Sequence, residues 1–132
     1  MYDDFLVNIL SPSETVLETS AYTVTLPGKE GVFSVLAGHS KLIANLNIGI
    51  ISVSEKKGEG KYFVSGGIAQ VEGGELNIVS EFAVNLTDFD QIKVAGYIEG
   101  LENELRTVEQ DSLQAEIIRD KLEKYKSLRQ FL

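Results

Sequence analysis

Residues 75–108 read ELNIVSEFAVNLTDFDQIKVAGYIEGLENELRTV, and the spacing of their apolar residues changes near Asn85. Before Asn85, apolar residues such as Leu76 and Ile78 recur at every second position, which is typical of a strand with one buried face. After Asn85 they recur at steps of three and four, as on one face of a helix. This change of period predicts a β-rich part followed by a helical part.

The part before Asn85 has the composition of an all-β domain. All twelve glycines except Gly96 and Gly100 precede it, and so do both prolines. Apolar residues alternate there between glycine-rich breaks such as Gly66-Gly67, which are typical of turns. Several short strands at this spacing favour an antiparallel sandwich or barrel. We therefore predict strands near residues 4–10, 15–26, 32–36, 42–45, 48–54, 61–66, 68–72 and 75–84.

The part after Asn85 predicts two helices that fold back on each other. Thr87 and Asp88 offer oxygen atoms that can cap the first helix, and Asp90 places negative charge in its first turn. The polar residues 109–112 separate two narrow apolar stripes, so we expect a hairpin of helices of about 20 residues each, with the stripes burying each other. The first stripe is Ile98, Leu101, Leu105 and Val108, and the second is Leu113, Ile117, Ile118, Leu122, Tyr125 and Leu128.

Together these patterns predict a β + α chain with two domains. Residues 1–86 are expected to form an antiparallel β-sandwich that folds alone, and residues 87–132 an antiparallel helical hairpin. Gly96 and Gly100 each cost the first helix up to roughly 1 kcal/mol relative to alanine, which favours a hairpin that can detach as a regulatory arm. The alternative is that these glycines permit close approach to the sandwich or to the second helix.

The overall composition excludes several classes of protein. The chain has 132 residues, no cysteine, one histidine and a net charge of −8. Thiolate metal sites, disulfides and cysteine nucleophiles are therefore absent, and the negative charge argues against nucleic-acid binding. No apolar run reaches the roughly 18 residues that span a bilayer, and acidic residues near the start replace the basic region of a secretory signal. We expect a soluble, intracellular protein without direct membrane insertion.

No catalytic constellation is evident in the sequence. Gly28-Lys29 and Gly60-Lys61 both lack the rest of a phosphate-binding loop. His39 lies beside Ser40, but no Gly-x-Ser-x-Gly nucleophile elbow accompanies them. We expect no enzymatic activity, no metal and no cofactor.

Charge distinguishes the two predicted helices. Residues 87–111 carry seven acids against Lys93 and Arg106, whereas the last helix has a net charge of +2. This basic surface has two explanations: complementarity to the helix dipole with pairs such as Asp120–Lys124, or a face that binds an acidic partner. The basic residues are Arg119, Lys121, Lys124, Lys126 and Arg129.

Residues 26–46, LPGKEGVFSVLAGHSKLIANL, resemble the signature of a known family. That family is the epsilon subunit of bacterial F-type ATP synthases, called delta in mitochondria. The blocks FVSGGIAQV at 63–71, IVSE at 78–81 and DFD at 88–90 resemble its later motifs in the same order. The chain departs from the usual residues at Ser34, Ala37, Lys41 and Gln70.

The resemblance implies an N-terminal sandwich of about ten strands, a C-terminal helical hairpin and a non-catalytic rotor role. The sandwich would dock on the gamma subunit and the c-subunit ring, coupling proton flow to ATP synthesis in the alpha–beta head. We expect the exposed turn Gly38, His39, Ser40 and Lys41 to make a rotor contact. The hairpin would contact alpha and beta through its basic residues and inhibit hydrolysis. The complex would lie on the cytoplasmic face of the bacterial inner membrane.

Some members of the family bind ATP through an I/L-D-x-x-R-A motif at the start of the first helix. Here Asp90 is kept, but Lys93 stands where the motif has arginine and Val94 where it has alanine. Lysine offers a point charge in place of a planar two-pronged donor. We therefore expect ATP to bind weakly or not at all.

Two other classes of function are compatible with a soluble sandwich. One is a free-standing ligand-binding β-sandwich with a coiled-coil tail, for example a carbohydrate module, although the chain has no tryptophan for such a site. The other is a small hydrolase, which would need a base besides His39. Co-purification with a gamma subunit distinguishes the rotor subunit from both.

Overall fold

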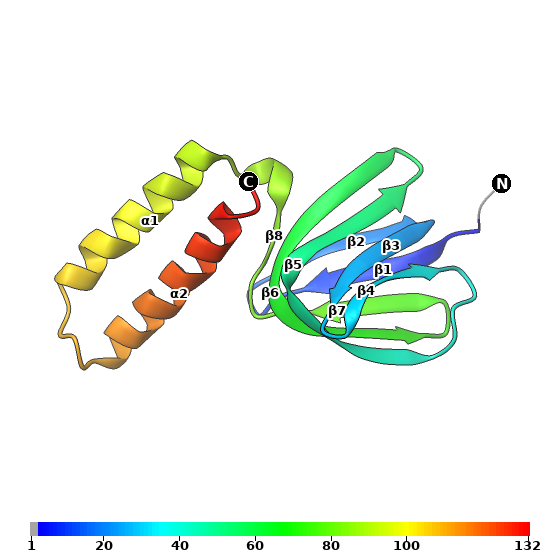
Figure 1. Cartoon of the computed structure of the whole chain (residues 1–132), viewed down its shortest axis with the longest axis horizontal. Coiled ribbons are helices and arrows are strands. Elements are labelled where there is room, and N and C mark those ends of the chain that lie inside the picture. The colour runs from blue at the N-terminus through cyan, green and yellow to red at the C-terminus, as the bar shows by residue number, and fades with distance from the viewer. Residues whose placement is uncertain (1–2) are drawn as a thin grey trace. The chain divides into compact units, whose positions relative to one another are not determined.

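The computed structural model describes residues 3–132 and divides into two compact units. The first unit ends at Leu86 and the second comprises Thr87–Leu132. The first is a β-sandwich and the second consists of two helices joined by a short loop, as Figure 1 shows. The predicted fold class, a β-sandwich followed by a helical hairpin, is confirmed.

The sandwich is one eight-stranded sheet that does not close on itself. Its strand order is β2-β1-β7-β6-β5-β3-β4, and β8 pairs with β6 beside this path. The β1–β7 pair is parallel and every other pair is antiparallel. The strands are β1 Phe5–Leu10, β2 Thr15–Ala21, β3 Thr23–Gly28, β4 Gly31–Leu36, β5 Leu42–Glu55, β6 Gly58–Glu72, β7 Glu75–Val79 and β8 Ala83–Asn85.

The sheet has eight strands where the family resemblance implied about ten. Eight strands were also predicted from the residues, but with other boundaries, because β5 and β6 were predicted as four short strands. β5 and β6 pair in one unbroken register from Leu42 opposite Val71 to Glu55 opposite Gly58. Gly67, expected to mark a break between strands, lies inside β6 with a φ of 137°. A Cβ atom there would lie 2.2 Å from the carbonyl oxygen of Val79. The glycine therefore permits a bend and a close backbone approach without ending the strand, and β5 and β6 curve through the sandwich in Figure 1.

The opposite error occurs at two other places. The predicted strand 15–26 is interrupted at Tyr22 and forms β2 and β3. The predicted strand 75–84 is interrupted after Val79, where the buried Ser80 donates its backbone N–H to the Leu10 carbonyl oxygen at 3.0 Å. Neither segment contains a glycine or a proline to mark the interruption, so the sequence pattern did not reveal them.

Alternating side chains build the core of the sandwich. On β1, Phe5, Val7 and Ile9 point inward, and on β3 Val24 and Leu26 do the same. This is the period-two pattern that the sequence predicted. The same cluster includes buried side chains from the other long strands, among them Leu46, Ile51, Val53, Tyr62, Val64, Leu76 and Ile78.

A short 3-10 turn, Leu86–Asp88, spans the boundary between the two units and is followed by α1, Gln91–Arg106, and α2, Leu113–Arg129. Thr87 and Asp88 are therefore not the cap of α1. The cap is Asp90, whose carboxylate accepts the backbone N–H of Lys93 at 2.7 Å. Ser112 caps α2 by accepting the backbone N–H of Ala115 at 3.1 Å. The helices have 16 and 17 residues, shorter than expected, because the caps and the connecting loop take more of the chain.

The predicted apolar stripes are only partly correct. Leu113 and Ile117 are 70% and 49% exposed, so placing them in the buried stripe was wrong. Positions advance by about 100° per residue, which turns Ile117 away from Ile118, a residue that is buried. The buried residues of the hairpin are Val94, Ile98, Ala115, Ile118, Leu122 and Leu128.

Candidate functional surfaces

The predicted contact turn connects β4 to β5. Gly38 has a φ of 82°, which lets the chain reverse there. The backbone N–H of His39 donates to the Leu36 carbonyl oxygen at 3.1 Å. The His39 Nδ1 atom lies 2.8 Å from the carbonyl oxygen of Ser40. A carbonyl oxygen can only accept, so Nδ1 carries the proton, and the imidazole is held by its own turn.

Lys41 differs from the rest of the turn because it has an ionic partner. Its Nζ atom lies 3.1 Å from the Glu72 carboxylate, and the two side chains are 76% and 54% exposed. An ion pair this exposed contributes little to stability. The pair nevertheless holds the lysine against the end of β6.

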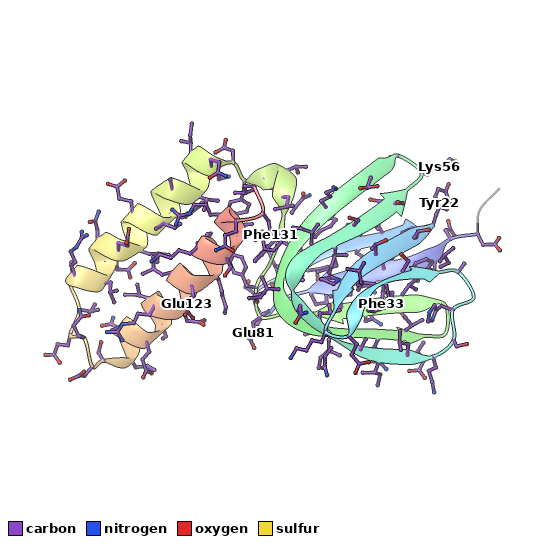
Figure 2. The ribbon with its side chains drawn as sticks, viewed as in Figure 1. Tyr22, Phe33, Lys56, Glu81, Glu123 and Phe131 are labelled. Atoms are coloured by element: carbon purple, nitrogen blue, oxygen red, sulfur yellow. The ribbon has the colours of Figure 1, made fainter. Side chains whose placement is uncertain are left out.

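An open groove of about 720 Å³ lies beside the turn. It is lined by residues 28–34 of the β3–β4 hairpin, by His39 and by the first part of β5; Phe33, labelled in Figure 2, is one of these lining residues. Of the four predicted contact residues, only His39 reaches it. Val32 and Ile43, which also line it, are 74% and 71% exposed.

These two apolar residues were missed by sequence reasoning. Both lie within predicted strands, where an apolar residue is most simply assigned to the core. The signal was the adjacent pair Val32-Phe33, because successive strand residues face opposite sides and one of the two must point outward. We call Val32, His39 and Ile43 the groove surface.

The start of α1 holds the two residues compared above with a nucleotide-binding motif. The Asp90 carboxylate is engaged as the helix cap. The Lys93 Nζ atom donates to the Asp88 carbonyl oxygen at 3.0 Å and lies 5.3 Å from the centre of the Phe89 ring. Both charged groups therefore already have partners in their own segment.

The basic residues of α2 do not share one face. The Arg119 guanidinium donates to the Gln110 carbonyl oxygen at 2.7 Å in the connecting loop. The Lys124 Nζ atom lies 2.8 Å from the Asp120 carboxylate, which confirms that predicted pair. Among the residues that the structure describes, the other three make no ion pair: Lys121, Lys126 and Arg129.

Helix geometry separates two of these free lysines. At about 100° per residue, Lys121 lies within roughly 80° of Leu113 and Ile117, whereas Lys126 lies roughly opposite. Leu113 and Ile117 are exposed. We call Leu113, Ile117 and Lys121 the outer strip of α2.

The described residues contain no arrangement of side chains typical of a metal centre. Between residues 3 and 132, no three histidine, aspartate or glutamate side chains are placed to hold an ion. In the same range, no helix is both long enough and apolar enough to cross a bilayer.

The fold and the groove define the class of the protein: an open β-sandwich that carries an exposed apolar groove, followed by a two-helix hairpin. A family model for the β-sandwich domain of the ATP synthase delta/epsilon chain matches residues 4–86. The chain belongs to this family, as its motifs had suggested.

Two relatives illustrate the match along the chain. The ATP synthase epsilon chain of Rickettsia conorii is 35% identical over 103 residues, covering 76% of this chain and 92% of the relative. That of Bradyrhizobium sp. strain ORS 278 is 33% identical over 128 residues, covering 97% of this chain and 93% of the relative. The second match includes the hairpin.

Solved structures share the fold. A chain in the cryo-EM structure of the Euglena gracilis mitochondrial ATP synthase, which shows OSCP, F1 and the c-ring, superimposes with a TM-score of 0.64. It is 28% identical, and the match covers 95% of this chain and 79% of that one. A chain from the central stalk and c-ring of the Tetrahymena thermophila mitochondrial ATP synthase has a TM-score of 0.57 at 13% identity, covering 97% and 98%.

Proposed function

We propose that this chain is a non-catalytic rotor subunit in the central stalk of a bacterial, proton-translocating ATP synthase. The observation that carries the proposal is the match over 97% of the chain to a relative named ATP synthase epsilon chain. The Euglena structure, with F1 and the c-ring in its title, supports the same assembly. Membership of this family favours a rotor role over a free-standing ligand-binding module.

The sandwich provides the rotor contact in this proposal. The groove surface offers exposed apolar side chains beside the polar turn at residues 38–41. Exposed apolar residues rimmed by polar ones are typical of protein interfaces. The gamma subunit and the c-ring are the partners, and through them the chain couples proton flow to ATP synthesis. It is held at the cytoplasmic face of the inner membrane by these partners and not by insertion.

A pull-down with purified gamma subunit tests the contact. Val32→Asp and Ile43→Asp place a charge in the groove surface and should weaken capture by about tenfold or more, as expected when an interface core residue is lost. Ile92→Asp is the matched control, because Ile92 is also apolar and 84% exposed but lies in α1. Equal capture of all three variants would show that the groove surface is not the contact.

The hairpin is the inhibitory arm in this proposal. Its outer strip combines two exposed apolar residues with Lys121, which has no ion-pair partner among the described residues. Such a strip fits a partly apolar, acidic surface, and we assign it to the alpha and beta subunits of the head. Deleting residues 112–132 should raise ATP hydrolysis by the assembled complex.

A matched pair of charge reversals gives a sharper test of the arm. Lys121→Glu should raise hydrolysis, whereas Lys126→Glu should not, because Lys126 lies on the other side of α2. Added salt should reduce the difference between wild type and Lys121→Glu by screening the charge. Unchanged hydrolysis in both the deletion and Lys121→Glu would remove inhibition from the proposed function and leave the rotor contact.

Nucleotide does not regulate this arm in the proposal. The Asp90 carboxylate caps α1, and the Lys93 ammonium donates to the Asp88 carbonyl oxygen and lies near the Phe89 ring. Lys93 offers a phosphate a point charge in place of the planar two-pronged donor of arginine. Titration calorimetry of the purified chain with ATP should give no saturable heat at micromolar ligand. A micromolar site that disappears in Asp90→Ala would make the chain an ATP sensor instead.

A further inference from the structure

Three aromatic rings meet in the helical unit. Phe89 comes from the segment before α1, Tyr97 from α1 and Tyr125 from α2. The tyrosine rings stack with centroids 5.1 Å apart and planes 15° apart. The Phe89 centroid lies 6.0 Å from that of Tyr97 and 6.4 Å from that of Tyr125. We call these three rings the aromatic clasp.

The clasp lies toward the end of the hairpin that the chain does not close. At the tip, residues 107–112 join the helices covalently. At the other end, α1 begins and α2 finishes, so only non-covalent contacts join them. Besides the clasp, the Gln91 side-chain amide donates to the Leu132 carbonyl oxygen at 3.1 Å. The stacked tyrosines are thus one of the contacts that join the two helices toward the open end, where Val94 and Leu128 are also buried.

Phe89 is itself held in place. The Lys93 ammonium lies 5.3 Å from the centre of its ring and donates to the carbonyl oxygen of Asp88, the preceding residue. This cation–π contact and the hydrogen bond link the segment before α1 to the first turn of the helix. These two contacts hold the Phe89 ring against Tyr97 and Tyr125.

α1 depends on such contacts because its own sequence has a low helix propensity. Gly96 and Gly100 are exposed, and a Cβ atom at either position would meet nothing within 4 Å. The glycines therefore do not serve close packing against α2, and that explanation considered for them is wrong. They lower the intrinsic helix propensity of α1, and a helix of this length is marginal unless it packs against a partner.

We propose that the aromatic clasp is the latch that keeps the two helices paired at the open end and sets how often the hairpin separates there. The latch regulates the arm assigned above, so its role in the ATP synthase rests on the proposed function. The pairing itself is a property of the isolated chain. Loss of the Tyr97–Tyr125 stack lets the open end part while the tip stays joined.

Spin-label distances in the full-length chain test the latch directly. The chain has no cysteine, so two introduced cysteines take the labels without background. One pair, Ala95→Cys with Lys126→Cys, reports on the open end, and a second, Arg106→Cys with Gln114→Cys, reports on the tip; all four positions are exposed.

The variants are chosen to keep the fold. Tyr97→Leu and Tyr125→Leu retain apolar bulk and helix propensity but lose the stack. In each, we expect the single short distance at the open end to be joined by a longer population, with the tip distance unchanged. Tyr125→Phe keeps a stacking ring and should behave as wild type. Glu123→Gln, at an exposed position outside the outer strip, is the control for a substitution elsewhere on α2.

Two results would overturn the latch. Unchanged open-end distances in both leucine variants would show that the stack does not hold the helices together. Broad distances at both ends would show that the rings support the whole hairpin and not one end of it. Circular dichroism of the sandwich strands should be unaltered in every variant.

Hydrolysis by the assembled complex separates the latch from the proposed function. If the leucine variants part the open end but leave hydrolysis unchanged, the latch stands and inhibition by the arm fails. If they change hydrolysis without altering the open-end distances, the latch is wrong and the arm remains supported.

Discussion

The sandwich and the hairpin bury their side chains to very different extents. Among the described residues, seven of the fully buried phenylalanine, leucine and isoleucine side chains lie in the sandwich, and one, Leu128, lies in the hairpin. The sandwich strands are also joined by pairing between segments far apart in the sequence. Elements with few buried contacts open at lower free energy than the core. We therefore expect the sandwich to be the more rigid of the two units and the hairpin to open more readily.

The largest expected effect comes from removing a core side chain of the sandwich. Leu26→Ala deletes a side chain that is 1% exposed, and we expect it to lower the free energy of unfolding by about 2–5 kcal/mol. Urea unfolding followed by circular dichroism at a β-sensitive wavelength measures it.

The matched substitution in the hairpin is Leu122→Ala, where the leucine is 6% exposed. It should melt the helical signal early and leave the strand transition unchanged. Coincident transitions of both signals in both variants would contradict two units of different stability.

A smaller effect of opposite sign is expected in α1. Gly96→Ala and Gly100→Ala add methyl groups that meet no neighbouring atom, so each should stabilise the helix by up to about 1 kcal/mol. Helical circular dichroism during thermal melting measures the gain. Gly67→Ala is the control in the sandwich, where the added Cβ would collide with a carbonyl oxygen and should destabilise. Loss of helical stability in the α1 variants would restore a packing role for the two glycines.

Hydrophobic period predicted the architecture because it depends only on local spacing. The change near Asn85 correctly placed strands before it and a hairpin after it. The spacing of apolar residues could not locate the strand boundaries, because a glycine pair such as Gly66-Gly67 marks a turn in one context and a bend within a strand in another. That choice is made by the backbone of β7, which approaches Gly67 too closely for any side chain.

The candidate sites were less accessible to sequence reasoning. The turn at residues 38–41 was found because turn residues are recognisable locally. The groove beside it joins Val32 to Ile43 across that turn, and the clasp joins Tyr97 to Tyr125 across the hairpin. Such contacts depend on the rotation of each element about its axis, which the apolar pattern constrained too weakly, as the exposed Ile117 shows.

Alkaline pH should weaken the hairpin through one residue of the clasp. Burial, and secondarily the nearby Tyr97, raise the pKa of Tyr125 above its ordinary value of 10.0. Above pH 10 the unfolded chain releases this proton before the folded one, so the folded state binds more protons and the free energy of unfolding falls as pH rises. Below pH 10, where Tyr125 is protonated in both states, its contribution to the free energy of unfolding is fully present.

Tyr125→Phe isolates that contribution because it keeps the ring and removes the hydroxyl. The loss of hairpin stability between pH 9 and pH 11 should be larger in wild type than in Tyr125→Phe, because the two proteins differ only in this hydroxyl. Helical melting at the two pH values measures the difference. Equal losses would show that folding of the hairpin does not raise the pKa of the Tyr125 hydroxyl.

The smallest expected effect is on the sandwich when the hairpin is removed. A chain ending at Leu86 keeps every strand pair of the sheet and the whole core cluster. We therefore expect a cooperative β-type unfolding transition with a free energy within about 1 kcal/mol of the full-length value, because surface changes away from the core have effects of that size. The same truncated chain should still capture gamma, since the groove surface lies wholly within it. An insoluble or non-cooperative product would show that the sandwich needs the helices, and the rigid and movable parts of the chain would then be one unit.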